Sequence, residues 1–310
     1  MSSATSSLTS DELVERLIAR KQPDKDLGQH YLISDEALDR AVELAALCAE
    51  DHVLEVGPGP GTLSQKILRT GARLCAIEID PVTCEHLRDN ISNEMNLIEG
   101  DALRVRLPQD LSAVVANIPF QISSPLIDRL AQHQRQYSGI NSIVLLLQEE
   151  FAARLCMSEG VSSRGSLGMT TAMEWNAKLD IKVHSHAFKP APKVHSRLVH
   201  LTPNDPISKM EEGIPRPEPR LARLVVSTAF KERRKKMRNR LRQAPKHISR
   251  VKGWHASGYR EAAKALLEKP DRMGLPLGWQ EARPEQLDLQ TWLTVAGWLQ
   301  RIHDEKEPVY

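Results

Sequence analysis

Residues 52–68, HVLEVGPGPGTLSQKIL, place a short apolar run before a glycine-rich turn and an amphipathic segment. The apolar run predicts a buried strand and the segment from Thr62 predicts a helix. Gly57, Gly59 and Gly61 are spaced GxGxG, whereas the dinucleotide-binding fingerprint is GxGxxG. Glycines let a backbone turn sharply and approach a ligand closely. Taken alone, the stretch fits a ligand-binding turn and a plain tight turn about equally well.

The same alternation of strand and helix continues to about residue 203. Helices are predicted over 62–69, 81–90 and 124–133, and a further helix over 35–47 begins near a capping Ser34. Such alternation is typical of an α/β fold with a parallel sheet and helices on both faces. The strands are predicted over residues 52–56, 73–79, 96–98, 113–116, 142–147 and 197–201.

Acidic side chains stand near the ends of the next two predicted strands. Glu78 follows Gly57 by 21 residues, and Asp101 lies in the segment EGDAL after the third strand. A carboxylate at the second strand tip can accept hydrogen bonds from both ribose hydroxyls, and ligands of open α/β sheets bind at these tips. Asp101 can accept a hydrogen bond from an adenine amino group, or it can serve as a helix N-cap. The sequence thus offers acceptors for a ribose and for an adenine, next to a turn that lacks the pyrophosphate-binding fingerprint. A cofactor of this kind is S-adenosylmethionine.

The composition changes at residues 201–220, LTPNDPISKMEEGIPRPEPR, where five prolines mark a linker. We therefore expect a flexible and partly helical N-terminal extension over residues 1–24 and an α/β domain over residues 25–204. A basic helical domain is expected over residues 205–310. Four late tryptophans are expected in the core of that last domain: Trp254, Trp279, Trp292 and Trp298.

The overall composition is that of a globular protein, with 41% hydrophobic and 26% charged residues in a chain of 310. The net charge of +2 gives no strong global attraction to nucleic acid. None of the four cysteines forms a CxxC pair, which favours reduced thiols in the cytoplasm over disulfides or a metal site. No apolar run is long enough to span a membrane, so we expect no membrane association.

Several motifs, in order, resemble those of the ribosomal RNA adenine N6,N6-dimethyltransferase family, which is related to the erythromycin-resistance methyltransferases. The resemblance covers about two-thirds of the chain, and it implies a Rossmann-like class I methyltransferase sheet with a smaller helical C-terminal domain. The motifs are LGQHYL (27–32), LEVGPGPGTLS (54–64), IEID (77–80), GDAL (100–103), NIPF (117–120), QEEFAARL (148–155), FKPAPKVHS (188–196) and AFKERRKKMRNRL (229–241).

The resemblance also implies a binding role for particular residues. His30 and the Leu32 backbone cover the methionine end of S-adenosylmethionine, Glu78 holds its ribose and Asp101 its adenine. The full set of cofactor-binding residues implied is Gln29, His30, Leu32, Gly57, Gly59, Glu78, Ile79, Asp101, Ala102 and Asn117. Two positions depart from the pattern. His30 stands where many members have Asn, and His195 stands where Asp is usual, which leaves the role of His195 open.

The stretch ANIPFQI (116–122) can be read as a plain strand end with turn residues, or as a catalytic turn. The adenine N6 is a poor nucleophile because its lone pair is delocalised into the ring. Acceptors at its two hydrogens, namely the Asn117 oxygen and the Ile118 carbonyl, favour a usable lone pair. Pro119 fixes the backbone, and Phe120 offers a stacking surface for an extruded base. Phe188 is a second stacking candidate, or a core residue beside a proline-rich turn.

Residues 230–242, FKERRKKMRNRLR, carry eight basic residues and one acidic residue. We predict a helix whose stripe of Phe230, Met237 and Leu241 faces the core. The alternatives for its charges are a solvated face and an RNA phosphate-binding surface, with Arg233, Arg234, Lys235 and Lys236 as contact residues.

The function predicted from these observations is dimethylation of two adjacent adenosines in a loop near the 3′ end of small-subunit ribosomal RNA. The expected partner is that RNA or the immature small subunit, bound by a monomer. Two alternatives are an assembly factor that binds RNA without chemistry and a resistance-type methyltransferase of large-subunit RNA. A non-catalytic assembly factor is expected to have lost the cofactor-binding or NIPF motifs, and both are intact here.

Overall fold

The computed structural model describes residues 8–24, 27–91 and 95–305. By internal contacts the chain divides into two units, of which the first comprises Met1–Cys156 and Asn176–Pro203 and the second Met157–Trp175 and Asn204–Tyr310. The division at residue 203 lies close to the boundary predicted near residue 205. Residues 157–175, however, also belong to the second unit, so the chain leaves the first unit and returns to it once.

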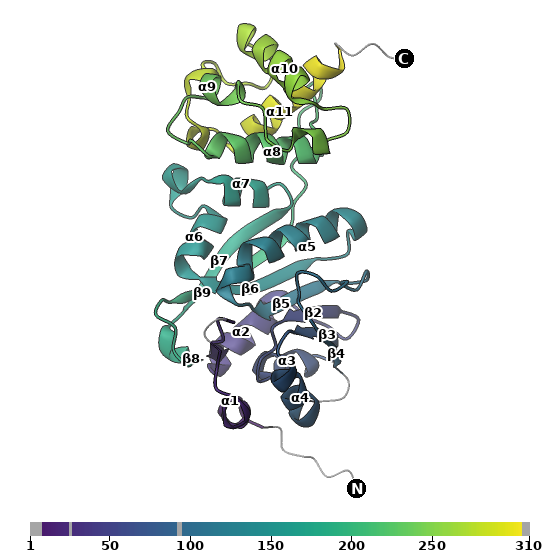
Figure 1. The fold of residues 1–310 in the computed structure, drawn as a ribbon, viewed down its shortest axis with the longest axis vertical. Coiled ribbons are helices and arrows are strands. Elements are labelled where there is room, and N and C mark those ends of the chain that lie inside the picture. Colours follow the sequence, from purple (N-terminus) through teal and green to yellow (C-terminus); the bar gives the residue numbers. More distant parts are fainter. Residues whose placement is uncertain (1–7, 25–26, 92–94, 306–310) are drawn as a thin grey trace. The chain divides into compact units, whose positions relative to one another are not determined.

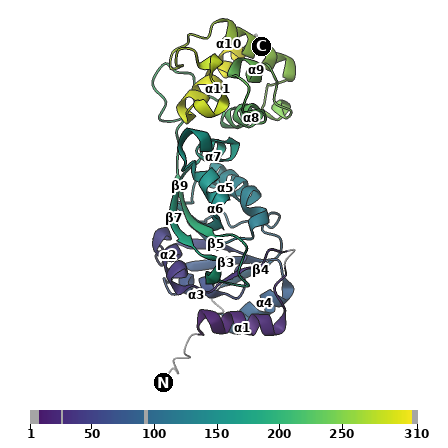
Figure 2. The same ribbon diagram turned by 90° about the vertical axis from the view of Figure 1, so that its left-hand side faces the viewer.

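The first unit is built on a seven-stranded sheet of order β4-β3-β2-β5-β6-β9-β7 (Figures 1 and 2). All six predicted strands are confirmed, with ends that differ by at most two residues. Strand β7 (Trp175–Val183) was not predicted, because it has no continuous apolar run. The other strands are β2 (His52–Val56), β3 (Arg73–Glu78), β4 (Asn96–Glu99), β5 (Ala113–Asn117), β6 (Ser142–Gln148) and β9 (Ser196–Pro203).

The prediction of a parallel sheet is correct for β2 to β6 and wrong for β9. The first five strands pair in parallel, whereas β9 pairs with β6 in the antiparallel direction, with Leu145 opposite Val199. A buried apolar run has the same sequence pattern in either direction, so periodicity alone cannot reveal the reversal.

Helices cover both faces of this sheet (Figure 2). On one face, α2 (Asp35–Ala45) and α3 (Thr62–Leu68) pack Leu38 and Ile67 against strand residues such as Val144. Helix α4 (Pro81–Asn90) lies beside α3 on this face, where Leu87 of α4 packs with Leu68 of α3. Helix α5 (Ser123–Tyr137) covers the other face, and α6 (Glu149–Cys156) follows β6 directly. The predicted cap of α2 is confirmed, because the Ser34 side chain accepts a hydrogen bond from the Ala37 amide. These helices bury the sheet, and its carboxyl edge carries the loops.

The N-terminal extension is not a detached tail in its described part. Helix α1 (Ser10–Arg20) begins with a capping box formed by Thr9 and Glu12, and it buries Leu13, Val14 and Leu17. Residues 1–7 lie outside the described residues. After α1, the two-residue strand β1 (Tyr31–Leu32) pairs with β8 (Phe188–Lys189) in a separate small sheet.

The second unit is helical in its described elements, as predicted. Its core contains all four late tryptophans, whose side chains are at most 9% exposed. No helix in the described ranges has both the length and the apolar character needed to cross a bilayer. The helices are α7 (Ser166–Thr171), α8 (Pro219–Phe230), α9 (Met237–Leu241), α10 (Ala256–Glu268) and α11 (Leu289–Asp304). Short 3-10 turns cover Phe120–Ile122, Gly160–Ser163, Ser185–Ala187, Ile248–Arg250, Trp279–Glu281 and Pro284–Gln286 along the chain.

Candidate active site

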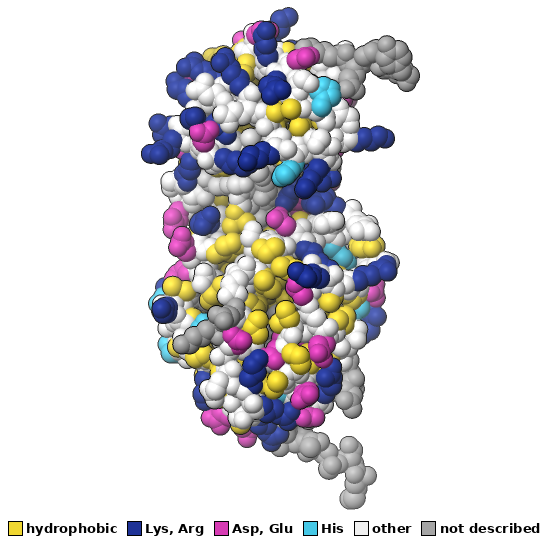
Figure 3. Space-filling model, in the orientation of Figure 1, with side chains coloured by type: hydrophobic (Ala, Val, Ile, Leu, Met, Phe, Trp, Pro, Cys, Tyr) yellow, Lys and Arg dark blue, Asp and Glu magenta, His cyan; other side chains and the backbone are white. Residues whose placement is uncertain are grey.

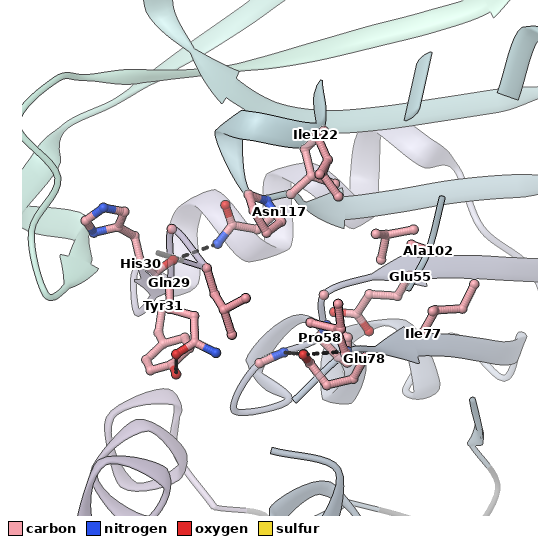
Figure 4. A pocket seen from close by; sticks show the side chains of 18 of the residues that line it. Gln29, His30, Tyr31, Glu55, Pro58, Ile77, Glu78, Ala102, Asn117 and Ile122 are labelled. Carbon is pink, nitrogen blue, oxygen red and sulfur yellow. Dashed lines mark hydrogen bonds between the residues drawn. The ribbon is translucent and has the colours of Figure 1, made fainter. Parts of the chain in front are cut away.

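A pocket lies at the carboxyl ends of β2, β3 and β5 (Figure 4). Every residue that the sequence assigned to the cofactor or to the catalytic turn lines this one pocket. Its walls come from five segments that lie far apart in the sequence, namely 27–32, 55–63, 77–79, 100–102 and 117–122. Because parallel strands end at a common edge, residues about twenty positions apart in the sequence are brought within reach of one ligand.

The glycine turn adopts backbone angles that exclude a side chain. Gly57, Gly59 and Gly61 have φ of 68°, 54° and 88°. A Cβ on Gly59 would lie 3.1 Å from the ring of Tyr31, and one on Gly61 would lie 2.6 Å from Ile91. Tyr31 and Ile91 therefore pack so closely against the turn that Gly59 and Gly61 have no room for a side chain.

Glu78 is fixed by the backbone around it. Its Oε1 accepts hydrogen bonds from the amides of Ile79 and Asp80 at 2.8 and 3.0 Å, and its Oε2 accepts one from Gly59 at 3.3 Å. Burial raises the pKa of Glu78 above its usual value, although these three amides oppose the increase. An ionised carboxylate has about four acceptor positions, and the three amides use three of them, so one position on Oε2 remains for a ribose hydroxyl.

Apolar and polar groups meet around the third strand tip. Ile79 is 51% exposed although it is a large aliphatic residue, and Ala102 lines the same pocket. Asp101 accepts a hydrogen bond from the Leu103 amide at 2.9 Å, so one of its oxygens shapes the turn. The guanidinium of Arg129 on α5 donates to the carbonyls of Ala102 and Val105 and so holds this loop. The arrangement suits an adenine ring, with apolar faces and an acceptor at its edge.

Asn117 is the last residue of β5, and its side chain is oriented by one hydrogen bond. Its Nδ2 donates to the backbone carbonyl of His30 at 3.0 Å (Figure 4). A carbonyl can only accept, so the amide nitrogen must face His30, which leaves Oδ1 as the acceptor on the other side. Pro119 then ends the strand with φ of −55°, and Phe120 begins the short turn that leads into α5. The Phe120 ring lies 6.2 Å from the His30 ring at an interplanar angle of 27°.

The geometry can be compared with known proteins. The sequence profile of a family described as "Ribosomal RNA adenine dimethylase" matches residues 20–255. The chain belongs to the ribosomal RNA adenine dimethylase family. The catalytic chemistry of this family is methyl transfer from S-adenosylmethionine, and the carboxylate, the exposed aliphatic side chain and the glycine turn of this pocket fit that cofactor.

Individual members of the family cover most of the chain. A probable ribosomal RNA small subunit methyltransferase A of Natronomonas pharaonis is 36% identical over 247 residues, which are 78% of this chain and 84% of the relative. The corresponding protein of Prochlorococcus marinus is 34% identical over 289 residues, covering 90% of this chain and 93% of that one. Similarity at this level extends through both units.

Two solved structures share the fold. A dimethyladenosine transferase from Plasmodium falciparum gives a TM-score of 0.64 at 24% identity and covers 85% of this chain and 95% of its own. The 23S rRNA methyltransferase ErmE gives a TM-score of 0.57 at 24% identity over 87% of this chain and 99% of its own. These likenesses confirm the predicted Rossmann-like methyltransferase fold.

One buried carboxylate in this dimethylase was missed from the sequence. Glu55 lies on β2, is 1% exposed and lines the pocket floor, where Ser64 donates a hydrogen bond of 2.6 Å to it. Burial, with a smaller contribution from Glu78, raises the pKa of Glu55 to about 8. The available signal was a charged residue inside the apolar run HVLEV, which a buried strand does not otherwise tolerate.

Phe188 is a correction to the predicted substrate-binding set. Its side chain is 3% exposed and belongs to the apolar cluster that contains Leu32 and Val183. The core alternative is therefore the observed one, since a ring packed on all sides offers no free face to a base. His195 does not line the pocket. Its backbone carbonyl accepts from the Glu149 amide, and its ring lies 5.1 Å from that of His184.

The basic segment is not the continuous helix predicted from its pattern. Helix α8 ends at Phe230, residues 231–236 form turns, and α9 begins at Met237. At the break, Arg240 is 2% exposed and donates to the carbonyls of Thr228 and Ala229 at the end of α8. One of the eight basic residues is thus a buried cap of the preceding helix. The predicted apolar stripe is confirmed as core-facing, with Met237 and Leu241 buried and Phe230 packed against the same core.

Carboxylates partly neutralise three of the four predicted RNA-contact residues. Lys235 pairs with Glu232, Lys236 with Glu281, and Arg233 lies 3.9 Å from Glu285. Arg234 is exposed and makes no ion pair with any group in the described ranges. Figure 3 shows many Lys and Arg side chains on the visible face of this unit. Arg234 is therefore the one of these four predicted contact residues whose charge is least compensated.

The buried Glu55 leads to a prediction about stability. Its pKa is about 8 in the folded state against 4.5 as the ordinary value, so the folded state favours the protonated form. The protonated Glu55 makes its full contribution to stability below pH 4.5. This contribution is lost progressively as the pH rises from 4.5 to about 8. Glu55→Gln keeps the acceptor for Ser64 but does not ionise. Between pH 5 and pH 8.5 the wild type should lose about 2–4 kcal/mol of unfolding free energy relative to this variant.

Urea unfolding of both proteins at the two pH values measures this difference. The exposed Glu150 provides the control, because Glu150→Gln removes a carboxylate that is not buried. Parallel stability profiles for the wild type and Glu55→Gln would show that Glu55 ionises without cost.

Proposed function

We propose that this dimethylase transfers methyl groups to N6 of two adjacent adenosines in a loop near the 3′ end of small-subunit ribosomal RNA. The observation that carries the proposal is the Asn117 amide, which the His30 carbonyl holds with its oxygen available in the same pocket as Glu78. An acceptor placed there suits an amino group as the methylated atom. The family and the small-subunit names of its relatives support ribosomal RNA as the substrate.

The side chains of the turn supply orientation. When bound, S-adenosylmethionine provides a methyl group that is already activated by the positive sulfonium, so no covalent enzyme intermediate is required. Asn117 Oδ1 and the Ile118 carbonyl accept the two hydrogens of N6 and favour a lone pair that points at the methyl group. Rate then comes from positioning and from exclusion of water. We assign no general base, and the proton leaves to solvent after transfer.

The target base must be unstacked to enter the pocket. A base inside a helix cannot reach it, so the substrate is a loop or a flipped nucleotide. Phe120 stacks on the extruded adenine, while Arg234 and its basic neighbours bind phosphates. The partner is small-subunit RNA in an immature subunit, and the enzyme acts as a cytoplasmic monomer. The intact pocket and NIPF turn distinguish this enzyme from an assembly factor that has lost its chemistry.

The proposal is tested by incubating the protein with labelled S-adenosylmethionine and unmethylated small subunits. Nucleoside analysis should find N6,N6-dimethyladenosine at two neighbouring positions near the 3′ end of the RNA. Large subunits serve as the second substrate. Label that appears only in large-subunit RNA would support the resistance-type alternative, and label in neither would contradict methyltransferase activity on ribosomal RNA.

Substitutions in the NIPF turn should impair different steps. Asn117→Ala removes an acceptor aimed at the reacting nitrogen, so its loss should fall mainly on turnover, with a smaller loss of cofactor affinity. Phe120→Ala removes the stacking surface, which is worth ~1–3 kcal/mol per base. It should slow the second methylation more, because N6-methyladenosine has one hydrogen fewer to hold it in place.

Single-turnover assays that count mono- and dimethyladenosine separately measure both effects, and circular dichroism checks the fold. If both folded variants methylate at the wild-type rate, residues 116–122 are only a strand end followed by a turn.

Substitutions in the basic segment should change the salt dependence of RNA binding. Arg234→Gln removes one uncompensated charge. The negative slope of log affinity against log salt concentration should therefore become shallower by about 0.7–0.9. Neutralising Arg233, Arg234, Lys235 and Lys236 together should lower it further, with cofactor affinity unchanged. Lys264→Gln on α10 removes a charge that is 78% exposed in the same unit and serves as the control. Equal slopes for Arg234→Gln and Lys264→Gln would identify the segment as a solvated face.

A further inference from the structure

Asp80, two residues after Glu78, uses its two carboxylate oxygens for different purposes. Oδ1 accepts the Val82 amide at 3.1 Å and so caps α4. Oδ2 accepts Lys21 Nζ at 2.6 Å and Gln29 Nε2 at 3.4 Å. A helix cap needs only the first oxygen. The second binds two groups of the N-terminal segment, and the whole side chain is only 3% exposed.

The bond to Gln29 continues into a chain of contacts beneath the pocket. With Nε2 directed at Asp80, the Gln29 oxygen accepts the Tyr31 hydroxyl at 3.0 Å and the Asp24 amide at 2.8 Å. The Tyr31 ring supports the turn at Gly59, whose amide in turn donates to Glu78. Asp80 therefore connects the strand tip that carries Glu78 with the pocket wall formed by residues 27–32.

The same network sets the charge around Glu78. Asp80 is a like charge near Glu78, and its repulsion contributes to the raised pKa of Glu78. Lys21 places an ammonium group on Asp80 and offsets this repulsion. Burial by itself would raise the pKa of Asp80, but the bonds from Lys21 and Gln29 bring it below its usual value. The other titratable or charged groups that act on this region are Asp24 and Tyr31 beside β1, Glu55 on β2, Cys84 and Arg88 on α4, and Glu99 on β4.

We propose that Lys21, Gln29 and Asp80 are positioning residues for the cofactor. They hold the wall at residues 29–32 against the glycine turn, and they keep Glu78 ionised so that its remaining acceptor position can take a ribose hydroxyl. The inference rests on the proposed function for the identity of the ligand. It gives helix α1, which ends at Arg20 next to Lys21, a part in cofactor binding although α1 does not line the pocket.

Two substitutions break the Lys21–Asp80 pair and have opposite electrostatic effects on Glu78. Lys21→Met leaves Asp80 uncompensated, whereas Asp80→Asn removes the like charge and keeps an N-cap oxygen for α4. Both loosen the pocket wall, so each should weaken S-adenosylmethionine binding at pH 7.5 by about fivefold to tenfold. The loss of affinity at low pH should begin at a higher pH in Lys21→Met and at a lower pH in Asp80→Asn than in the wild type.

The measurement is calorimetric titration of the full chain with S-adenosylmethionine from pH 5.5 to 8.5, with KM and kcat determined alongside. The effect should fall on KM, and the double variant should lose less than the two single losses multiplied together. Arg20→Met is the matched control. It breaks the exposed Arg20–Asp89 pair between α1 and α4, at 2.8 Å, without touching the network.

The outcomes separate this inference from the function on which it rests. A wild type that does not bind S-adenosylmethionine contradicts the proposed function. A wild type that binds, with Lys21→Met matching it in affinity and pH profile, overturns the positioning role. So does a shift in the same direction for both variants, because a purely structural loss does not depend on the sign of the charge removed. If Asp80→Asn does not fold, Lys21→Met alone still tests the inference. Lys21 is 35% exposed, so its substitution should leave the fold intact.

Discussion

The hydrogen bond between Asn117 Nδ2 and the His30 carbonyl is the contact on which the active site depends. It joins the tip of a central strand to a segment 87 residues earlier in the sequence, and it fixes which side of the amide faces the ligand. Without it, the Asn117 amide could rotate by half a turn and present donors where acceptors are needed. The wall formed by residues 27–32 would also lose this hydrogen bond to β5. One bond therefore both orients the Asn117 amide and joins two walls of the pocket.

Three carboxylates lie close together below that bond, and each is compensated in a different way. Glu55 has a hydroxyl partner and the raised pKa expected of a buried carboxyl. Glu78 is held by three backbone amides, and Asp80 by an ammonium group, an amide side chain and a helix N-terminus. Buried charges are tolerated only when partners are provided. The glycine turn provides one of these partners, because the Gly59 amide donates to Glu78.

Much of this site could be predicted from the sequence because its parts are local. Strand ends, the glycine turn and the acidic tips each occupy a few adjacent residues, and a common sheet edge brings them together. The missed features depend on distant partners. The direction of β9 is set by its pairing with β6. Phe188 is buried in the cluster around Leu32. The break after Phe230 is capped by Arg240. The sequence shows Glu55 as a charged residue inside an apolar run but not its partner Ser64, and the connection from Lys21 to Asp80 spans 59 residues.

The basic segment shows why counting charges overstates a nucleic-acid surface. Of its eight basic residues, Arg240 is buried as a helix cap, and Lys236 and Arg238 share the carboxylate of Glu281. An RNA phosphate that binds the latter two must compete with Glu281, so part of the attraction is offset by the lost ion pair. Exposed pairs of this kind are worth at most about 1 kcal/mol each, and salt screens them as it screens the phosphate contacts. The carboxylates therefore weaken binding to any single phosphate without abolishing it. A surface compensated in this way favours a partner that presents several phosphates at the right spacing, as a folded RNA does, over an isolated anion.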